Sequence, residues 1–262
     1  AHQFARHGYV DAEGRSFEPS ARTNTPSGGW PGLCPDHAAV QRLEERFMTA
    51  VLRHVAGRKG VAFWEPVNEP HQWIDFTRNP PGVYCYCEAT RSLFREWLRK
   101  KYASLPALEQ AWGHRYASWE DVRPPTWQFG YTDWADWRTF TADNIATLVA
   151  RRTGLIRRHA AQPVLAHAWG GGSVGCHQLG AMAFDDWKNA APMDKWGYSA
   201  FPSSLSGLPA IGLGTDATRG AAGGKEFWQS ELSAGDTGYG FQRKGRVDPR
   251  VLAAWSWESI RH

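Results

Sequence analysis

The chain has 262 residues, of which 42% are hydrophobic and 21% are charged, and its net charge is +4 at pH 7. This composition is typical of a globular protein, and the length allows one domain or two small ones. Basic residues are dispersed and no apolar stretch approaches the roughly eighteen residues of a membrane span, so neither nucleic acid nor a membrane is predicted as a partner. The N-terminus has no initiator Met and no signal-peptide core, and we expect the chain to begin inside a longer protein.

Segments with strand and helix patterns alternate along the chain. Residues 1–35 are rich in Gly, Pro, Ser and Asn and predict a long loop. Apolar residues at helical spacing predict helices at 36–56, 88–102, 106–112, 134–160, 179–190 and 249–262. Short apolar runs predict strands at 61–67, 163–169, 194–202 and 224–235. Such alternation indicates a parallel sheet with helical crossovers.

Polar and aromatic side chains gather where the predicted strands end. They are Asn68 and Glu69 after the first strand, His167 and Trp169 in the second, Tyr198 in the third, and Gln229, Ser230 and Glu231 in the fourth. In a (β/α) barrel the carboxyl ends of the strands meet at one face, where catalytic groups lie. The expected fold class is therefore α/β, with these side chains around one site.

Glu69 and Glu231 are the candidate catalytic pair, 162 positions apart (231 − 69). Hydrolysis of a glycoside with retention needs two carboxyl groups about 5–5.5 Å apart: one is an acid and then a base, with a raised pKa, and the other attacks the anomeric carbon. Pro70 should bias Glu69 towards an extended backbone. The alternatives are a solvated loop carboxylate at Glu69, or Glu226 in place of Glu231. Glu226, however, opens its strand and should lie at the other end of the barrel.

The sequence contains 15 Trp residues. Most must belong to an aromatic core, because each indole brings a large apolar area. Several stand instead beside Gly, Pro or carboxylates: Trp64, Trp73, Trp127, Trp169 and Trp228. Aromatic rings stack on sugars, bases and peptides alike, so the composition leaves the ligand open.

The motifs VNEP at 67–70 and FWQSE at 227–231 resemble those of the large clan of retaining glycosidases built on TIM barrels. More narrowly, the chain is similar to glycoside hydrolase family 42, the β-galactosidases. This similarity is carried by 7–15, 34–37, the cysteine-bearing segment 84–113 and the final helix 250–262. The resemblance implies that 1–262 is part of a single catalytic (β/α)8 TIM barrel domain, with about strands 4–7 present. Residues 1–35 would be the loop that follows the third strand.

Carried over by motif position, the resemblance implies that Glu69 is the acid/base and Glu231 the nucleophile in the cleavage of terminal β-D-galactosides. Asn68 would bind the sugar 2-hydroxyl, a contact that strengthens in the transition state, and Arg22 would help to hold the substrate. Further candidate substrate contacts at the strand ends are His167, Trp169 and Tyr198, each of which could equally be a packing residue. Family members are commonly trimeric and cytoplasmic, which implies a homo-oligomer for the full-length protein.

The cysteines match the family in part. A structural zinc is often held there by four cysteines, and three of these positions are occupied here, by Cys34, Cys85 and Cys87. Thr90 stands at the fourth position. A carboxylate, His or water can complete such a tetrahedron, and Glu88 and His37 are near in sequence. Free buried thiols without metal are the alternative; Cys176 is expected to be an ordinary free thiol, and no cofactor is expected for catalysis.

Three functions remain open, all with a carbohydrate partner. The first is a retaining β-galactosidase. The second is another retaining enzyme of the clan, such as a β-mannanase or β-glucosidase, which the short segment 113–120 and the general NEP motif permit. The third is a degenerate barrel that binds carbohydrate without turnover. The sequence has no Gly-rich phosphate loop, Ser nucleophile elbow or HExxH motif, so nucleotide, esterase and metalloprotease functions have little support.

Overall fold

The computed structural model describes residues 6–16, 33–72, 74–75, 82–126, 130–168, 183–200, 208–232 and 248–262. The chain divides into two compact units, Ala1–Glu45 with Gln72–Ala142 and Arg46–His71 with Asp143–His262. We refer to them as the first and the second unit. None of the helices in the described part of the chain is both long and apolar enough to cross a membrane.

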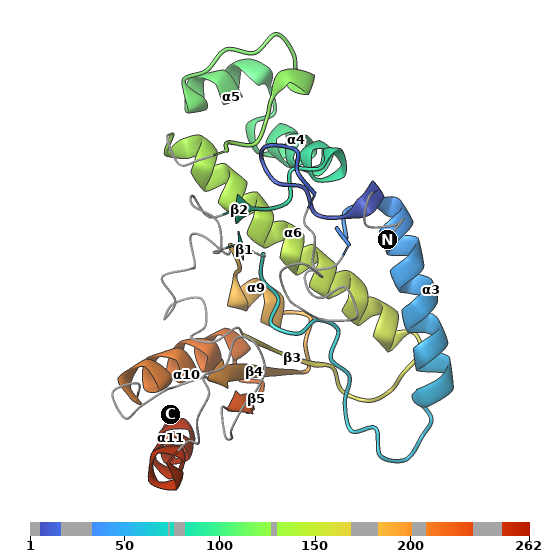
Figure 1. Ribbon diagram of the computed structural model, residues 1–262, viewed down its shortest axis with the longest axis vertical. Helices are drawn as coiled ribbons and strands as arrows, with labels where there is room; N and C mark the ends of the chain where they lie inside the picture. The colour runs from blue at the N-terminus through green and yellow to red at the C-terminus, as the bar shows by residue number, and fades with distance from the viewer. Residues whose placement is uncertain are drawn as a thin grey trace. The chain divides into compact units, whose positions relative to one another are not determined.

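Most helices lie close to their predicted positions. The helices of the described residues are α3 (Ala38–Val55), α4 (Glu88–Tyr102), α5 (Leu105–Trp112), α6 (Thr132–Arg157), α9 (Asp186–Ala190), α10 (Leu208–Ala222) and α11 (Pro249–Arg261), with a 3-10 turn at Trp119–Asp121 (Figure 1). The boundaries of α4 are those predicted. The helix predicted at 179–190 is present at Asp186–Ala190 but not at 183–185, because it begins only after Asp185, whose carboxylate accepts from the Lys188 N–H at 3.2 Å.

Helix α10 is absent from the sequence prediction. It contains Pro209 and three glycines, Gly212, Gly214 and Gly220, and both residue types weaken a helical pattern. The helix forms because it packs on the sheet and on α11 (Figure 1). Tertiary packing here overrides local propensity.

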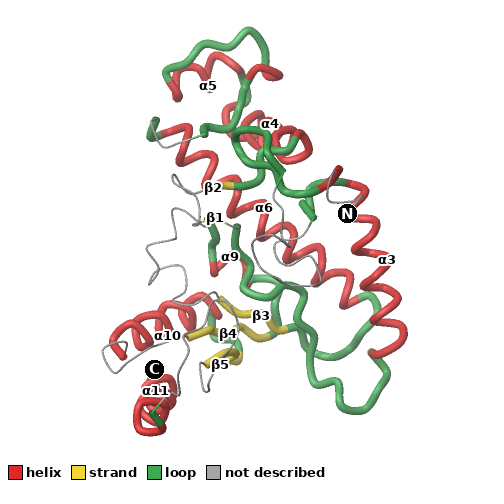
Figure 2. The backbone as a smooth tube through the Cα atoms, in the orientation of Figure 1, coloured by secondary structure: helices red, strands yellow, loops and turns green. Residues whose placement is uncertain are grey.

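The strands are short: β1 (Ile74–Asp75), β2 (Gly82–Val83), β3 (Leu165–Ala168), β4 (Lys195–Ala200) and β5 (Glu226–Leu232) (Figure 2). In the first unit, β1 and β2 pair antiparallel. In the second unit, β3, β4 and β5 form a parallel sheet in chain order. The carboxyl ends of these three strands therefore share one edge.

The predicted strand at 61–67 is not a regular strand. Only Trp64 pairs, in parallel with Val164. Its N–H donates to the Pro163 carbonyl at 3.0 Å, and its carbonyl accepts from the Leu165 N–H at 2.9 Å. Pro66 follows and has no N–H to continue the ladder. The segment nonetheless runs beside β3, as a fourth parallel member of the layer.

The core of the first unit is aromatic, as the Trp content predicts. Its buried members are Tyr86, Phe94, Leu98, Leu108, Trp112, Val122, Trp137 and Phe140. The Asp136 carboxylate is 2% exposed and accepts from the Trp112 Nε1–H at 2.8 Å, from the Tyr102 hydroxyl at 2.6 Å, and from Lys101. Hydrogen bonds from this many donors compensate the carboxylate for the hydration that it loses on burial.

The two faces of β4 have different roles. Trp196, Tyr198 and Ala200 are buried in apolar clusters, and the Tyr198 hydroxyl lies so close to α10 that a Cβ on Gly214 would be 2.4 Å from it. In the structure Tyr198 therefore packs against α10, on the other face of β4 from Ser199. Gly197 and Ser199 point to the opposite face, because side chains alternate along a strand.

Gly197 leaves room for side chains from both neighbouring strands. A Cβ there would be 2.0 Å from Ser230 Oγ and 3.0 Å from His167 Cβ. We expect Gly197→Ala to lower the free energy of unfolding by about 1–3 kcal/mol through overpacking, measured by urea denaturation. Gly220→Ala is the matched control: it meets nothing within 4 Å and should be neutral or stabilising in a helix. Equal stability of the two variants would contradict the close packing at Gly197.

Candidate active site

Glu69, His167 and Glu231 converge in the second unit. One carboxylate oxygen of each glutamate and one imidazole nitrogen lie within 4.8 Å of one another. They come from the turn after the Trp64 segment, from β3 and from β5. The convergence expected from the strand ends is thus present for these three residues.

The turn that carries Glu69 is anchored through its carbonyl groups. Arg152 Nη1 donates to Pro66 O at 3.3 Å, Asn189 Nδ2 donates to Pro70 O at 3.3 Å, and the His71 Nδ1–H donates to Glu69 O at 2.5 Å. His71 can do this as a neutral ring, because burial lowers its pKa to about 4.

The expectation of an extended Glu69 is wrong. Its φ is +44°, in the left-handed region that residues other than Gly seldom adopt. Anchors from distant helices overcome the local bias that Pro70 imposes. Such strain concentrates at functional sites, where the surrounding structure holds the backbone in place.

A β-bulge aims the Glu231 side chain. Gly197 pairs with Trp228 and Tyr198 with Gln229, but Ser199 pairs with Glu231, so Ser230 is an extra residue in β5. Regular pairing would have put Glu231 opposite Ala200, on the face that packs against α10. The one-residue shift moves Glu231 to the face of Ser199, where Glu69 lies.

The two glutamates have unlike environments. Glu69 is 9% exposed, whereas the Glu231 side chain is 38% exposed. Burial, and next the charge of Glu231, raise the pKa of Glu69 to about 7, against opposing effects of His167 and Ser199. Oε1 of Glu69 is buried and has no partner among the described residues. The pair can therefore combine a protonated carboxylic acid with a second, more solvated carboxyl group.

His167 lies between carboxylates. Its Nδ1 is 2.8 Å from Glu65 Oε1, and its Nε2 is 3.3 Å from Glu231 Oε1. Burial lowers the pKa of His167, but the hydrogen bond and charge of Glu65, together with the charges of Glu231 and Glu69, outweigh it, and the net shift is upward. Glu65 and Ser199 are site residues that the sequence analysis does not single out. The Glu65 signal was available, since Glu65 stands only four positions before Glu69.

The other predicted site residues are placed as follows. Asn68 is exposed, directly before Glu69. Arg22 and Trp169 lie outside the described residues. Glu226 begins β5, where it pairs with Lys195 at 2.5 Å, away from the end of β5 that carries Glu231. Two of the five Trp residues beside polar groups are described: the indole N–H groups of Trp64 and Trp228 donate to Gln162 and Glu226.

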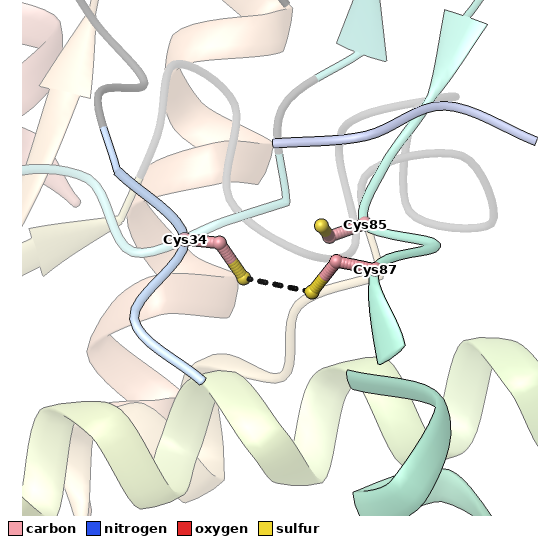
Figure 3. A group of neighbouring side chains, drawn as sticks. All are labelled: Cys34, Cys85 and Cys87. Carbon is pink, nitrogen blue, oxygen red and sulfur yellow. Dashed lines mark hydrogen bonds between the residues drawn. The ribbon is translucent and has the colours of Figure 1, made fainter. Parts of the chain in front are cut away.

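A second cluster, in the first unit, consists of the sulfurs of Cys34, Cys85 and Cys87, all within 4.8 Å of one another (Figure 3). The Sγ atoms of Cys34 and Cys87 point at each other, 3.7 Å apart. Thr90 Oγ1 lies 3.6 Å from the first and 3.3 Å from the second, and it donates to Asp36 Oδ2 at 2.6 Å. The cluster therefore has three sulfurs and one oxygen.

The residues that sequence proximity suggested as a fourth ligand lie elsewhere. Glu88 pairs with Arg95, and the His37 ring packs on His7, with centroids 4.9 Å apart. The pKa values of the thiols differ. Hydrogen bonds from Cys34 and Cys85 lower the pKa of Cys87, while burial raises the pKa of Cys85 to about 12. A cation would be needed to keep all three as thiolates.

The sequence profile of glycoside hydrolase family 42, described as Beta-galactosidase, matches residues 13–262. The chain belongs to glycoside hydrolase family 42. This family 42 chain is 24% identical over 266 residues to the β-galactosidase BgaA of Planococcus sp. (strain 'SOS Orange') and 23% identical over 264 residues to the β-galactosidase LacZ of Heyndrickxia coagulans. The alignments cover 96% and 97% of this chain but 35% and 36% of those proteins, so the chain spans about a third of the length of these curated relatives.

Solved structures show the fold of this family 42 chain. The crystal structure of β-galactosidase from Bacillus circulans sp. alkalophilus matches with a TM-score of 0.77 at 21% identity, over 100% of this chain and 37% of that one. The enzyme from the haloarchaeon Halorubrum lacusprofundi matches with a TM-score of 0.77 at 18% identity, over 98% and 38%. The predicted fold class is confirmed: the chain carries part of a (β/α)8 TIM barrel.

Gln229 stabilises the bulge that aims Glu231. Its Nε2 donates to the carbonyls of Tyr198 and Glu231, at 2.8 and 2.6 Å. Gln229→Glu replaces the donor with oxygen, and we expect it to lower the free energy of unfolding by about 1–3 kcal/mol. Chemical denaturation measures this effect. The control Gln110→Glu, at an exposed position on α5, should leave the stability unchanged; a Gln229→Glu variant that behaves like it would rule out this role.

Proposed function

We propose that this chain carries the acid/base and the nucleophile of a retaining β-galactosidase. The observation that supports this most is the Glu69–Glu231 pair, with carboxylate oxygens within 4.8 Å. Retaining enzymes hold their two carboxyl groups about 5–5.5 Å apart, whereas inverting enzymes keep them about 6.5–9.5 Å apart to admit a water, so the close approach of these oxygens favours retention. Both units would belong to one catalytic barrel domain, and we expect the full-length protein to be a homo-oligomer.

In the first step of this mechanism, Glu69 gives its proton to the glycosidic oxygen while Glu231 attacks the anomeric carbon. The bond to the leaving group breaks and an ester between Glu231 and the sugar forms. In the second step, Glu69 takes a proton from water, which displaces Glu231 from the anomeric carbon. Because the charge of Glu231 helps to raise the pKa of Glu69, formation of the ester removes that effect. The pKa of Glu69 then falls, as its change from acid to base requires.

The choice of substrate rests on the family and on the names of the relatives, which are β-galactosidases. Asn68, exposed beside Glu69, would donate to the sugar 2-hydroxyl, and Arg22 would contact the substrate. A β-mannoside or β-glucoside specificity is the alternative within the clan. A panel of aryl β-glycosides separates these cases, and turnover of the galactoside at the highest kcat/KM is the expected result.

Removing the acid should slow the reaction according to the leaving group. For Glu69→Gln we expect kcat/KM to fall by about 10²–10⁴-fold on a galactoside with a poor leaving group, and by less on an activated aryl galactoside that needs no protonation. Steady-state kinetics on both substrates measure this. Glu226→Gln, a matched substitution at the opposite end of β5, should retain activity. Equal losses on the two substrates would contradict an acid role for Glu69.

The pH dependence follows from the same residue. Only protonated Glu69 can give up a proton, and its pKa is raised to about 7. Activity should therefore be present below that pH and be lost as the pH rises through about 7, which a profile of kcat/KM against pH measures. The limb on the alkaline side should be missing from Glu69→Gln. If that variant keeps the wild-type limb, another group is the acid.

We further propose that the cysteine cluster holds a structural zinc, with Cys34, Cys85 and Cys87 as thiolate ligands. The Thr90 oxygen, hydrogen-bonded to Asp36, would stand at the fourth position. Zinc–sulfur bonds of about 2.3 Å place sulfurs about 3.8 Å apart in a tetrahedron, and a sulfur and an oxygen about 3.5 Å apart. The distances of 3.7, 3.6 and 3.3 Å fit that shape. The Asp36 carboxylate would orient the oxygen, and the metal would join the segment before α3 to the start of α4.

Metal analysis tests this without an activity assay. We expect about one zinc per chain by mass spectrometry of the purified protein, loss of it in Cys87→Ser, and tighter retention against a chelator in Thr90→Cys. Removal of zinc should lower the melting temperature, because metal binding contributes to folding free energy. Cys176→Ser is the matched control and should keep the metal. A protein without zinc, whose melting temperature a chelator leaves unchanged, would mean free thiols.

A further inference from the structure

His167 is a buried imidazole near three carboxylates. It is 3% exposed, and three carboxylates act on it: Glu65, Glu69 and Glu231. From β4, its register partner is the uncharged Gly197. A neutral sugar contact does not require this surplus of negative charge.

The geometry favours the protonated form of the ring. Nδ1 and Nε2 both face carboxylate oxygens, at 2.8 and 3.3 Å, and an ionised carboxylate can only accept. A neutral imidazole has one N–H and an imidazolium has two. Only the protonated ring can donate towards both Glu65 and Glu231. The Nε2 atom is buried and has no hydrogen-bond partner within the described residues, and the nearby Glu231 carboxylate is the acceptor towards which its N–H would point.

We propose that Glu65 holds His167 protonated, and that His167 is thereby a positioning residue that offsets the charge of Glu231 and directs its carboxylate towards the sugar. The inference rests on the proposed function for its catalytic meaning, but the Glu65–His167 ion pair can be tested without it. His167 transfers no proton in this scheme.

The pair also explains how the site tolerates so many carboxyl groups. With Glu69 protonated, the two remaining carboxylates and one imidazolium leave a net charge of −1. This charge complements the positive charge that develops on the sugar in the transition state. Without the imidazolium, Glu69 would hold its proton more tightly, because the His167 charge lowers the pKa of Glu69.

The kinetic test uses His167→Asn, the double variant Glu65→Gln/His167→Asn, and Glu226→Gln as control. We expect the alkaline limb of kcat/KM to move up by about 1 pH unit in His167→Asn, the size typical of losing one nearby opposite charge. The shift should be smaller in the double variant, since Glu65 itself raises the pKa of Glu69. The two amides of the double variant can bond to each other, which protects folding. The control should keep the wild-type profile.

A second measurement does not depend on activity. In NMR titrations of imidazole resonances, assigned with His167→Asn, the wild-type His167 signal should remain that of an imidazolium at pH values above the ordinary pKa of histidine. In Glu65→Gln the midpoint of the His167 titration should fall by about 1 pH unit. A neutral ring at pH 6 in the wild type, or an unchanged midpoint in Glu65→Gln, would overturn the inference. If the alkaline limb of kcat/KM does not move in His167→Asn, His167 has only a packing role. If the wild type lacks glycosidase activity but the midpoint shifts, the proposed function fails while the ion pair stands.

Discussion

A buried carboxyl group beside a second carboxylate is the arrangement on which the rest of the second unit depends. Glu69 is 9% exposed and lies within 4.8 Å of Glu231. Burial and repulsion both penalise its charged form, which is why it can hold a proton near neutral pH. Neither group would rest there unaided. The surrounding backbone must hold them together, and the proposed imidazolium of His167 would offset part of their charge.

The backbone meets this demand in two irregular places. The turn at Glu69 has a φ of +44°, and its carbonyls are held by side chains of α6 and α9. The strand that carries Glu231 has an extra residue just before it, and Gln229 bonds the carbonyls that the bulge disturbs. A regular strand and an extended turn would each have placed the carboxyl group elsewhere. The departures from regular structure are thus what create the pair.

The cysteine cluster has a comparable place in the first unit. Cys34 lies on the irregular chain before α3, while Cys85 and Cys87 precede α4. The Val10 N–H, from a further short segment, points at Cys85 Sγ at 3.3 Å. Single backbone hydrogen bonds, from Cys34 N–H to His7 O and from Tyr86 N–H to Val10 O, join these segments in place of regular secondary structure, and the cysteine side chains add to them. Thr90, on the first turn of α4, brings an oxygen where a fourth sulfur would otherwise stand, and Asp36 fixes its direction.

Local pattern accounts for much of the outcome. Helical spacing of apolar residues defined α4 to the residue, and the strand-end position of Glu69, His167 and Glu231 predicted that they meet. It failed for α10, whose glycines conceal a helix made stable by packing, and for the segment around Trp64, where prolines interrupt the ladder. It also gave Tyr198 two possible places, and only the contact with Gly214 decided between them.

By itself the sequence indicated the family, most of the strands and helices, and the two candidate glutamates, because motifs and periodicity are properties of neighbouring residues. Only the tertiary structure decided that a bulge turns Glu231 to the face of Glu69, that Glu65 pairs with His167, and that Asp36 stands beside Thr90. A register shift of one residue reverses the face of a side chain, and the free energy that selects it comes from packing between segments far apart in the chain. No local pattern carries that information.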